Sequence, residues 1–276
     1  MPAVLLRSRS GKISISRLLF IFLFTGIGIA AVTVYAIRRP EITSAMRGRQ
    51  VVEKYGCFAC HGPDGMGGIP DPVSPAGVMP GWEKATAVLY VNHHDDIAEW
   101  ILYGKVLGEH GELPEGLEPE NLEPMPAYEG RIGAGELADV ISYFIAVAEY
   151  YPDMPDEAYE GSEIARQYGC FGCHGPSGMG GMRNPGSFTG HIPAWDGEDY
   201  AKLVLDDEEL KEWILEGTNR RLMAHPVARR FLEKQLIKMP AYRAYLTDEQ
   251  LEKLMIYIKW LRGHEAKDRE AENPIA

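Results

Sequence analysis

The stretch "YGCFACHGPDGMGG" runs from Tyr55 to Gly68, and "YGCFGCHGPSGMGG" runs from Tyr168 to Gly181. Twelve of the fourteen positions are identical, and we expect the two differences, Ala59/Gly172 and Asp64/Ser177, to be minor. The two stretches contain every cysteine of the chain, namely Cys57, Cys60, Cys170 and Cys173. Each therefore carries one Cys-x-x-Cys-His motif, and no cysteine remains for a structural disulfide elsewhere.

A pair of cysteines at this spacing, followed directly by histidine, is typical of haem c attachment. The two thiols form thioethers with the porphyrin, and the histidine, here His61 or His174, is an axial ligand of the iron. A zinc site normally needs four ligands. A thioredoxin-like site does not require the histidine and occurs in a βαβ context, which is missing here. Two motifs that use all four cysteines predict two covalently attached haem c groups.

The duplication extends well beyond the motif. Matching residues are 113 positions apart over most of each copy and 114 apart after a single net insertion. Copies of about 110 residues are too long for solenoid units, so the pattern predicts a duplicated domain. The matched pairs include Gly48 and Gly161, Trp82 and Trp195, Trp100 and Trp213, Gly104 and Gly217, and Met125-Pro-Ala-Tyr128 and Met239-Pro-Ala-Tyr242.

Each copy has a helical pattern and no strand pattern. Apolar residues from Leu137 to Ala148 recur in steps of three and four, as on one face of a helix. The matching helix starts at Thr247-Asp-Glu-Gln250, a capping-box sequence, and should end near Leu261. Further helices are expected over 95–103 and 207–216. The Gly- and Pro-rich segments 62–80 and 175–193 should be loops.

On these residues the chain resembles the class I cytochromes c, in both copies, from about residue 44 to 262. The resemblance implies a distal methionine ligand just before the last helix, which here is Met125 or Met239. It implies that a glycine of the first helix crosses an aromatic of the last one. It also implies that the carbonyl of Pro72 or Pro185 accepts a hydrogen bond from the proximal histidine and orients it.

Other residues of these types have simpler expected roles. Met66 and Met179 lie only five positions after each histidine, too close to cross to the other face of the haem, so loop packing is favoured. Trp82 and Trp195 should pack near the haem edge. The remaining histidines have no counterpart in the other copy and are expected at the surface, although His191 and His225 are alternative distal ligands.

The N-terminal segment Leu18–Ile37 has twenty residues and no charge, which is the length of a transmembrane helix. Apolar cores of signal peptides usually have about 7–15 residues, so we favour an uncleaved anchor, despite a weak cleavage pattern at Val34-Tyr35-Ala36. Four basic residues flank each end, so charge does not set the orientation. The resemblance to c-type cytochromes implies haem attachment on the outer, periplasmic side of the cytoplasmic membrane.

The predicted fold is therefore all-α. A single N-terminal transmembrane helix precedes two tandem class I cytochrome c-like domains. We expect a short cytoplasmic N-terminus and the anchor in residues 1–40, the first domain in 41–152 and the second in 153–276.

Charge is distributed unevenly. The chain has a net charge of −12, but residues 1–39 contain six Lys or Arg and no acid, which leaves 22 basic and 40 acidic side chains, or −18, for the rest. Such a surface excludes nucleic acid as a partner and favours a basic redox partner. The segment ahead of Met125 is acidic and the one ahead of Met239 is basic, which suggests different docking partners for the two domains.

Histidine and methionine together saturate the iron and raise its potential. The resemblance thus implies an electron carrier, not an enzyme, that works with a membrane electron-transfer complex of a respiratory or photosynthetic chain and with a soluble carrier. The alternative is a dihaem cytochrome c peroxidase-like enzyme, although the similarity of the two ligand sets argues against it. A less favoured form of the electron-carrier hypothesis is the dihaem subunit of the high-affinity haem-copper oxidases, because the Pro-Trp-Trp segment usual in that subunit is not found here.

Overall fold

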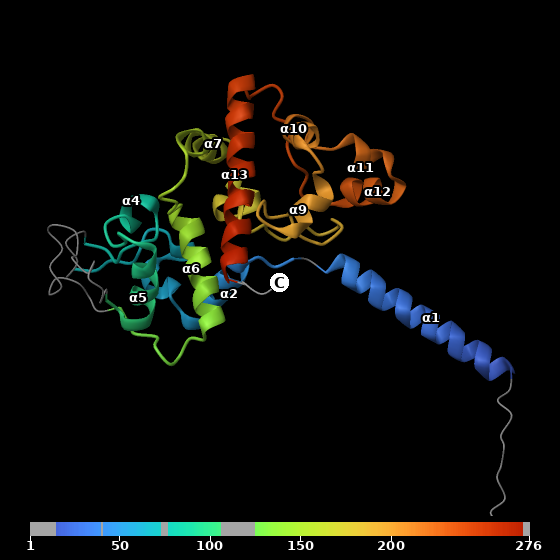
Figure 1. The fold of residues 1–276 in the computed structure, drawn as a ribbon, viewed down its shortest axis with the longest axis horizontal. Coiled ribbons are helices and arrows are strands. Elements are labelled where there is room, and N and C mark those ends of the chain that lie inside the picture. The colour runs from blue at the N-terminus through green and yellow to red at the C-terminus, as the bar shows by residue number, and fades with distance from the viewer. Residues whose placement is uncertain (1–14, 40, 73–76, 106–124, 273–276) are drawn as a thin grey trace, which may run out of the picture. The chain divides into compact units, whose positions relative to one another are not determined.

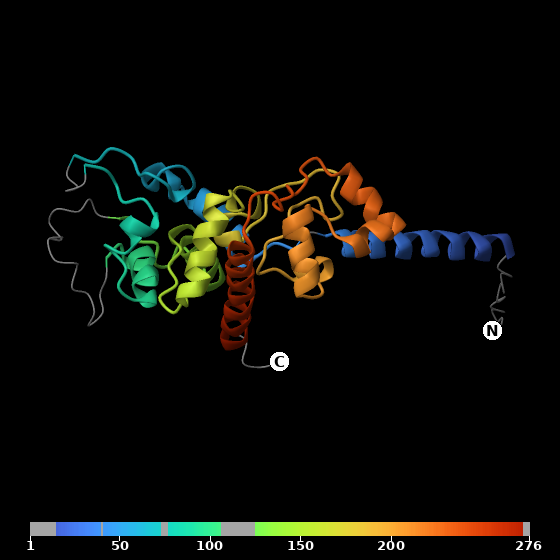
Figure 2. The same cartoon turned by 90° about the horizontal axis from the view of Figure 1, so that it is seen from above.

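The computed structural model describes residues 15–39, 41–72, 77–105 and 125–272 (Figures 1 and 2). The chain divides into two compact units, Met1–Arg39 and Pro40–Ala276. Regular structure within the described residues is helical and includes no strand, which confirms the helical prediction. Two isolated bridges, Pro70–Val78 and Arg183–His191, lie at equivalent places in the two copies.

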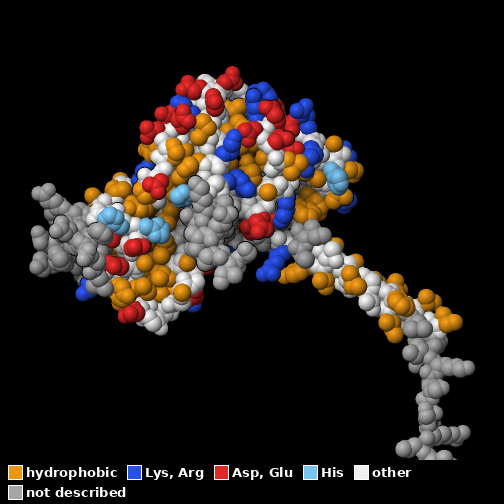
Figure 3. All heavy atoms as spheres, in the orientation of Figure 1, with side chains coloured by type: hydrophobic (Ala, Val, Ile, Leu, Met, Phe, Trp, Pro, Cys, Tyr) orange, Lys and Arg blue, Asp and Glu red, His pale blue; other side chains and the backbone are white. Residues whose placement is uncertain are grey.

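The first unit contains one helix, α1 (Ile15–Arg38). Its described side chains are largely apolar and exposed, as the row of apolar atoms along this helix in Figure 3 shows. Among the described residues, no helix has both the length and the apolar character needed to cross a membrane.

The second unit contains both copies of the repeat, each with a helix before the motif and a longer one at its end. The first copy comprises α2 (Ser44–Tyr55), α3 (Phe58–His61), the 3₁₀ turn η1 (Pro63–Gly65), α4 (Lys84–Ala87), α5 (His94–Tyr103) and α6 (Ala134–Ala148). The second comprises α7 (Asp156–Gln167), α8 (Phe171–His174), η3 (Pro176–Gly178), α9 (Glu198–Leu203), α10 (Asp207–Glu216), α11 (Arg220–Ala224), α12 (Pro226–Lys234) and α13 (Asp248–Glu272).

In each copy the first and last helices cross in close contact, α2 with α6 and α7 with α13. A Cβ atom on Gly48 would overlap the carbonyl of Asp139 and lie 2.8 Å from the Cβ of Tyr143. At Gly161 it would overlap the carbonyl of Lys253 and lie 2.7 Å from the Cβ of Tyr257. The expected crossing of glycine and aromatic is therefore confirmed in both copies.

Most expected helix bounds agree with the structure. The helices expected over 95–103 and 207–216 are α5 and α10. The capping box at the start of α13 forms as expected, because the Thr247 hydroxyl accepts from the Gln250 amide at 3.2 Å and the Gln250 side chain accepts from the Thr247 amide at 3.0 Å. The expected end near Leu261 is wrong: α13 continues to Glu272, since Gly263 alone does not stop it and no proline follows before Pro274.

The core of the second copy extends into the first, whereas a separate buried cluster around Val52, Trp82 and Tyr143 belongs to the first copy alone. Ala45 and Ala146 of the first copy belong to the same buried cluster as Trp195, Tyr257 and the other core residues of the second. Figures 1 and 2 show α4, α5 and α6 on one side of α13 and α9 to α12 on the other. The predicted domains 41–152 and 153–276 thus pack together within a single compact unit.

The crossing glycines generate the first prediction. We expect Gly48→Ala to destabilise the second unit by about 1–3 kcal/mol, because an added methyl group must push backbone against backbone in a close-packed core. Thermal unfolding followed by circular dichroism measures the effect. Gly135→Ala on α6 is the matched control, since a Cβ there meets nothing within 4 Å. It should raise the stability by up to about 1 kcal/mol through helix propensity, and equal effects of the two variants would contradict the steric explanation.

Candidate haem sites

The cysteines of each motif lie on a short helix directly after a sharp chain reversal. Helix α2 ends at Gly56 in the left-handed conformation, with φ 75°, and Gly169 has the same conformation at φ 74°. Glycine adopts this conformation without a steric penalty. The chain then enters α3, where the His61 amide bonds the Cys57 carbonyl at 3.0 Å. Helical spacing brings residues three and four apart onto one face, so both thiols and the imidazole of a motif lie close together.

The thiols are free and half-buried in both copies. Burial raises the pKa of Cys57, and it raises the pKa of Cys170 to about 11. Reactive redox cysteines depend on the opposite shift, because the thiolate is the nucleophile. In addition, the described residues include no group of three or more His, Cys, Asp or Glu side chains placed to hold a metal ion. The raised thiol pKa values therefore do not favour the thioredoxin-like alternative, and the lack of such a group among the described residues does not favour a zinc site.

Each motif histidine is oriented by a backbone carbonyl. The Nδ1 of His61 lies 2.7 Å from the Pro80 carbonyl, and the Nδ1 of His174 lies 2.9 Å from the Pro193 carbonyl. Burial lowers the pKa of both imidazoles. A neutral ring that donates from Nδ1 presents Nε2 as a lone pair, which is the form that binds a metal.

The expected acceptors Pro72 and Pro185 are wrong. The Pro185 carbonyl instead accepts from the amide of Leu236 at 2.9 Å, and Pro72 is exposed. The repeat spacing alone could not identify the correct prolines, because Pro72 and Pro185 are also 113 residues apart. Pro80 and Pro193 each lie two residues before a repeated tryptophan, and they are themselves 113 residues apart.

That repeated tryptophan packs against the proximal histidine. The ring centres of Trp82 and His61 are 5.1 Å apart, and those of Trp195 and His174 are 4.9 Å apart. Both indoles are buried. The amide of each also bonds the carbonyl of the 3₁₀ turn beside the motif, at 2.6 Å in the first copy and 2.7 Å in the second. Tryptophan therefore fixes the loop and excludes water from the imidazole.

The two Met-Pro-Ala-Tyr segments are held in the same way. The amides of Tyr128 and Tyr242 bond carbonyls near the ends of α5 and α10, each at 3.1 Å. Gly104 and Gly217 end these helices with φ 68° and 67°, and a Cβ on either would overlap the carbonyl of Met125 or Met239. The repeated glycine therefore allows the close approach that sets the position of each methionine. The acidic segment 106–124, ahead of Met125, lies outside the described residues.

In the second copy these groups surround a cavity of about 500 Å³, within the range of pockets that hold small molecules and cofactors. Cys170, Cys173 and His174 line it together with Met239. Its other walls are mostly apolar, and helices α11 and α12 form part of them through Leu222, Phe231 and further residues. Two thiols, an imidazole and a thioether around an apolar cavity fit a flat, largely apolar group that is attached at the cysteines.

Two further histidines line this cavity. His225 begins α12, where its Nδ1 accepts from the Ala228 amide at 3.3 Å. This structural role in helix capping is one that the sequence did not suggest. The Nδ1 of His191 is buried without a hydrogen-bond partner among the described residues. Neither histidine has a counterpart in the first copy. The expected surface position is confirmed for His225, which is exposed, but is wrong for His191, which is half-buried.

The basic segment that forms α11 and α12 is partly neutralised inside its own domain. Arg220 pairs with Glu212, and Arg221 pairs with Glu209 at 2.6 Å. Arg229 lies 3.7 Å from Glu233 on the same helix. Internal ion pairs therefore reduce the charge that this segment presents to a partner, and the segment also forms part of the cavity wall.

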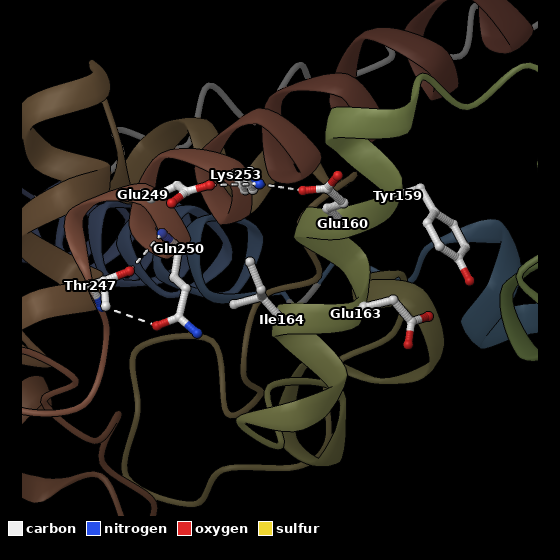
Figure 4. A pocket seen from close by; sticks show the side chains of 8 residues that line it. All are labelled: Tyr159, Glu160, Glu163, Ile164, Thr247, Glu249, Gln250 and Lys253. Atoms are coloured by element: carbon white, nitrogen blue, oxygen red, sulfur yellow. Dashed lines mark hydrogen bonds and ion pairs between the residues drawn. The ribbon is translucent and has the colours of Figure 1, made fainter.

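A second hollow, of about 420 Å³, lies where α7 crosses α13 (Figure 4). Lys253 lies there between Glu160, with which it pairs, and Glu249 at 2.9 Å. No cysteine or histidine lines this hollow. The ammonium group pairs with two of the carboxylates, and Glu163 lies 3.5 Å from Arg166, so the hollow is the ion-paired rim of a helix crossing.

Comparison with known proteins agrees with this geometry. The family described as cytochrome c matches residues 45–145 and again 158–262. The chain belongs to the cytochrome c family. Searches of curated proteins and of solved structures gave no match.

Cytochrome c domains bind haem c covalently and use it for electron transfer, and the presence of two domains fits two haem groups. In this cytochrome c chain, the residues that could hold the groups are the four cysteines, His61, His174, Met125 and Met239. When bound, the haem supplies reversible one-electron chemistry.

The assignment of the cysteines generates the second prediction. The protein matured with haem should carry two haem groups by intact-mass spectrometry. The double variant Cys57→Ser/Cys60→Ser should retain one group, and Cys170→Ser/Cys173→Ser should also retain one, because a serine cannot form the thioether. Retention of two covalent haems by either variant would contradict the assignment.

Proposed function

We propose that this protein is a membrane-attached dihaem cytochrome c that passes electrons between redox partners and performs no bond chemistry of its own. The main observation behind this proposal is that both family domains repeat the same arrangement. In each, a proline carbonyl fixes the histidine, a tryptophan packs against that histidine, and a methionine is held at the end of the middle helix.

The residues around each motif histidine support this function by keeping the ligand in a fixed position. The carbonyls of Pro80 and Pro193 keep each imidazole in one tautomer and one orientation. Trp82 and Trp195 shield the imidazoles. A site whose ligands do not move on oxidation or reduction needs little reorganisation, and Met/His ligation leaves no open position for a substrate. This argument supports an electron carrier over the peroxidase-like alternative.

Location is inferred from the N-terminal sequence. Leu18–Ile37 carries no charge, and the large apolar side chains of α1 that are described are exposed, including Phe22 at 71% and Val32 at 68%. We propose that this segment attaches the protein to the cytoplasmic membrane by a single pass and that the haem domains lie on the outer side. The covalent haem supports that side, by analogy with c-type cytochromes in general.

Charge supports a proposal for the partners. The net charge of −18 outside residues 1–39 would speed encounter with a basic soluble carrier. A membrane electron-transfer complex would be the other partner, because an attached protein stays within its reach.

The ligand assignment yields the third prediction. Met125→Ala and Met239→Ala should each abolish one of two methionine-to-ferric-iron charge-transfer bands and lower one reduction potential, because methionine ligation raises the potential. Redox titration of the haem-loaded protein, followed by absorption spectroscopy, measures both. Met66→Ala and Met182→Ala are matched controls, since these side chains are 49% and 44% exposed, and they should change neither.

The same spectra separate the two functions. A high-spin signal from either domain of the unaltered protein, or the absence of one band, would favour the peroxidase-like alternative. Unchanged bands in Met125→Ala or Met239→Ala would contradict the ligand assignment, and His191 and His225 would then be the residues to substitute in the second domain.

The location yields the fourth prediction. The full-length haem-loaded protein should stay with membranes and co-purify with an electron-transfer complex after mild solubilisation. A variant in which a cleavable secretory signal replaces residues 1–39 should be soluble and still carry both haems. Its reduction by a basic soluble cytochrome should slow as salt rises, since salt screens exposed charge. A soluble full-length protein would contradict attachment, and a salt-independent rate would contradict the charge argument.

A further inference from the structure

The two family domains contact each other through the loop that follows His174. The hydroxyl of Ser177 donates to the Ala146 carbonyl of α6 at 2.7 Å. The hydroxyl of Thr43, just before α2, donates to the Met179 carbonyl at 2.6 Å. The hydroxyl of Tyr151, in the linker, donates to the sulfur of Met179 at 2.9 Å. The proximal loop of the second haem site is thus hydrogen-bonded to both ends of the first domain's helix pair.

The equivalent loop of the first domain makes no such contact with the residues that the structure describes, although its backbone has the same form. Asp64 stands where Ser177 does, and their φ values are 58° and 52°. Tyr143 donates to the Asp64 carbonyl at 3.2 Å, as Tyr257 does to the Ser177 carbonyl at 2.9 Å. The backbone therefore does not account for the different surroundings of the two loops.

The two loops differ instead in their side chains and in how far these are buried. The Asp64 side chain is 57% exposed and pairs with Arg49 at 2.6 Å, whereas Ser177 is 1% exposed. Met66 is 49% exposed, and its counterpart Met179 is 1% exposed. A buried carboxylate needs compensation that a carbonyl neighbour cannot give, while a serine hydroxyl can donate to that carbonyl. The expectation that the Asp64/Ser177 difference is minor is therefore wrong, because Ser177 forms a buried hydrogen bond to the other domain whereas Asp64 forms an exposed ion pair within its own.

We propose that the Ser177–Ala146 hydrogen bond is the contact through which electrons pass between the two haem domains. This proposal rests on the proposed function. Within the first domain, the ring of Trp82 contacts His61 on one side and Phe144 of α6, at 5.8 Å, on another.

Ala146 follows Phe144 by two residues on α6, and its carbonyl accepts from Ser177, which follows His174 by three. Ring contacts, one short length of helix and one hydrogen bond therefore connect the two proximal histidines.

The step is a simple exchange. With haem bound, one electron would pass from the reduced domain to the oxidised one, so that one iron centre would be oxidised as the other is reduced. No bond forms or breaks.

The test removes the hydroxyl without straining the loop. Glycine adopts a positive φ freely, so Ser177→Gly deletes the donor and preserves the backbone, and Asp64→Gly makes the same change in the first domain as a matched control. We would measure the rate of electron exchange between the haems after photoreduction of the full-length haem-loaded protein. We would also measure interdomain docking by small-angle X-ray scattering and both reduction potentials.

We expect Ser177→Gly to slow the exchange several-fold with the domains still docked and both potentials unchanged, and Asp64→Gly to leave the exchange rate unchanged. Ser177→Asp should separate the loop from α6, which would expand the scattering profile and slow the exchange further. An unchanged exchange rate in Ser177→Gly, or in an expanded Ser177→Asp, would overturn the proposal. Reversible reduction of both haems by an external donor in the same samples would still support the electron-carrier function, and its absence in the unaltered protein would contradict that function separately.

Discussion

The close crossing of the first and last helices is the constraint on which each domain depends. Because Gly48 has no side chain, α6 approaches α2 closely enough for the Tyr143 hydroxyl to reach the Asp64 carbonyl at 3.2 Å. That turn in turn receives the amide of Trp82, whose ring packs against His61. The orientation of a metal-binding imidazole thus depends on a contact between two helix backbones.

The elements that repeat at a fixed spacing could be predicted from the sequence. The cysteines, the motif histidines, the crossing glycines and the capping box at Thr247 are local patterns, and a second copy at the same offset makes a chance match improbable. The acceptor of the histidine hydrogen bond could not be chosen in the same way, because each loop contains several prolines. Only the loop's path brings Pro193 to His174 and Leu236 to Pro185.

The contacts between the copies could not be predicted from the sequence either, for a different reason. The pairing of Ser177 with Ala146 joins positions in different copies, so the internal repeat gives no second example of it. A serine in place of an aspartate looks conservative when the loop is considered alone. It has a large effect here because the neighbouring domain removes that loop from water. A buried carboxylate would lose its hydration, whereas a buried hydroxyl needs only one acceptor for its proton.

The interface between the copies joins unlike surfaces, the loop of one domain and the helix pair of the other. Contacts of this kind do not close on themselves and can extend into open-ended chains of molecules. The first domain still exposes its own version of that loop, but Asp64 places a charge at the point where a neighbour's helix would bury it. At the other end, Trp260 stands where Ala146 does; its ring is already stacked on His264 and meets the ring of Tyr151 edge to face. At the two free ends of the pair, the positions equivalent to Ser177 and Ala146 therefore carry a charged aspartate and a large tryptophan in place of the two small residues that meet in the interface.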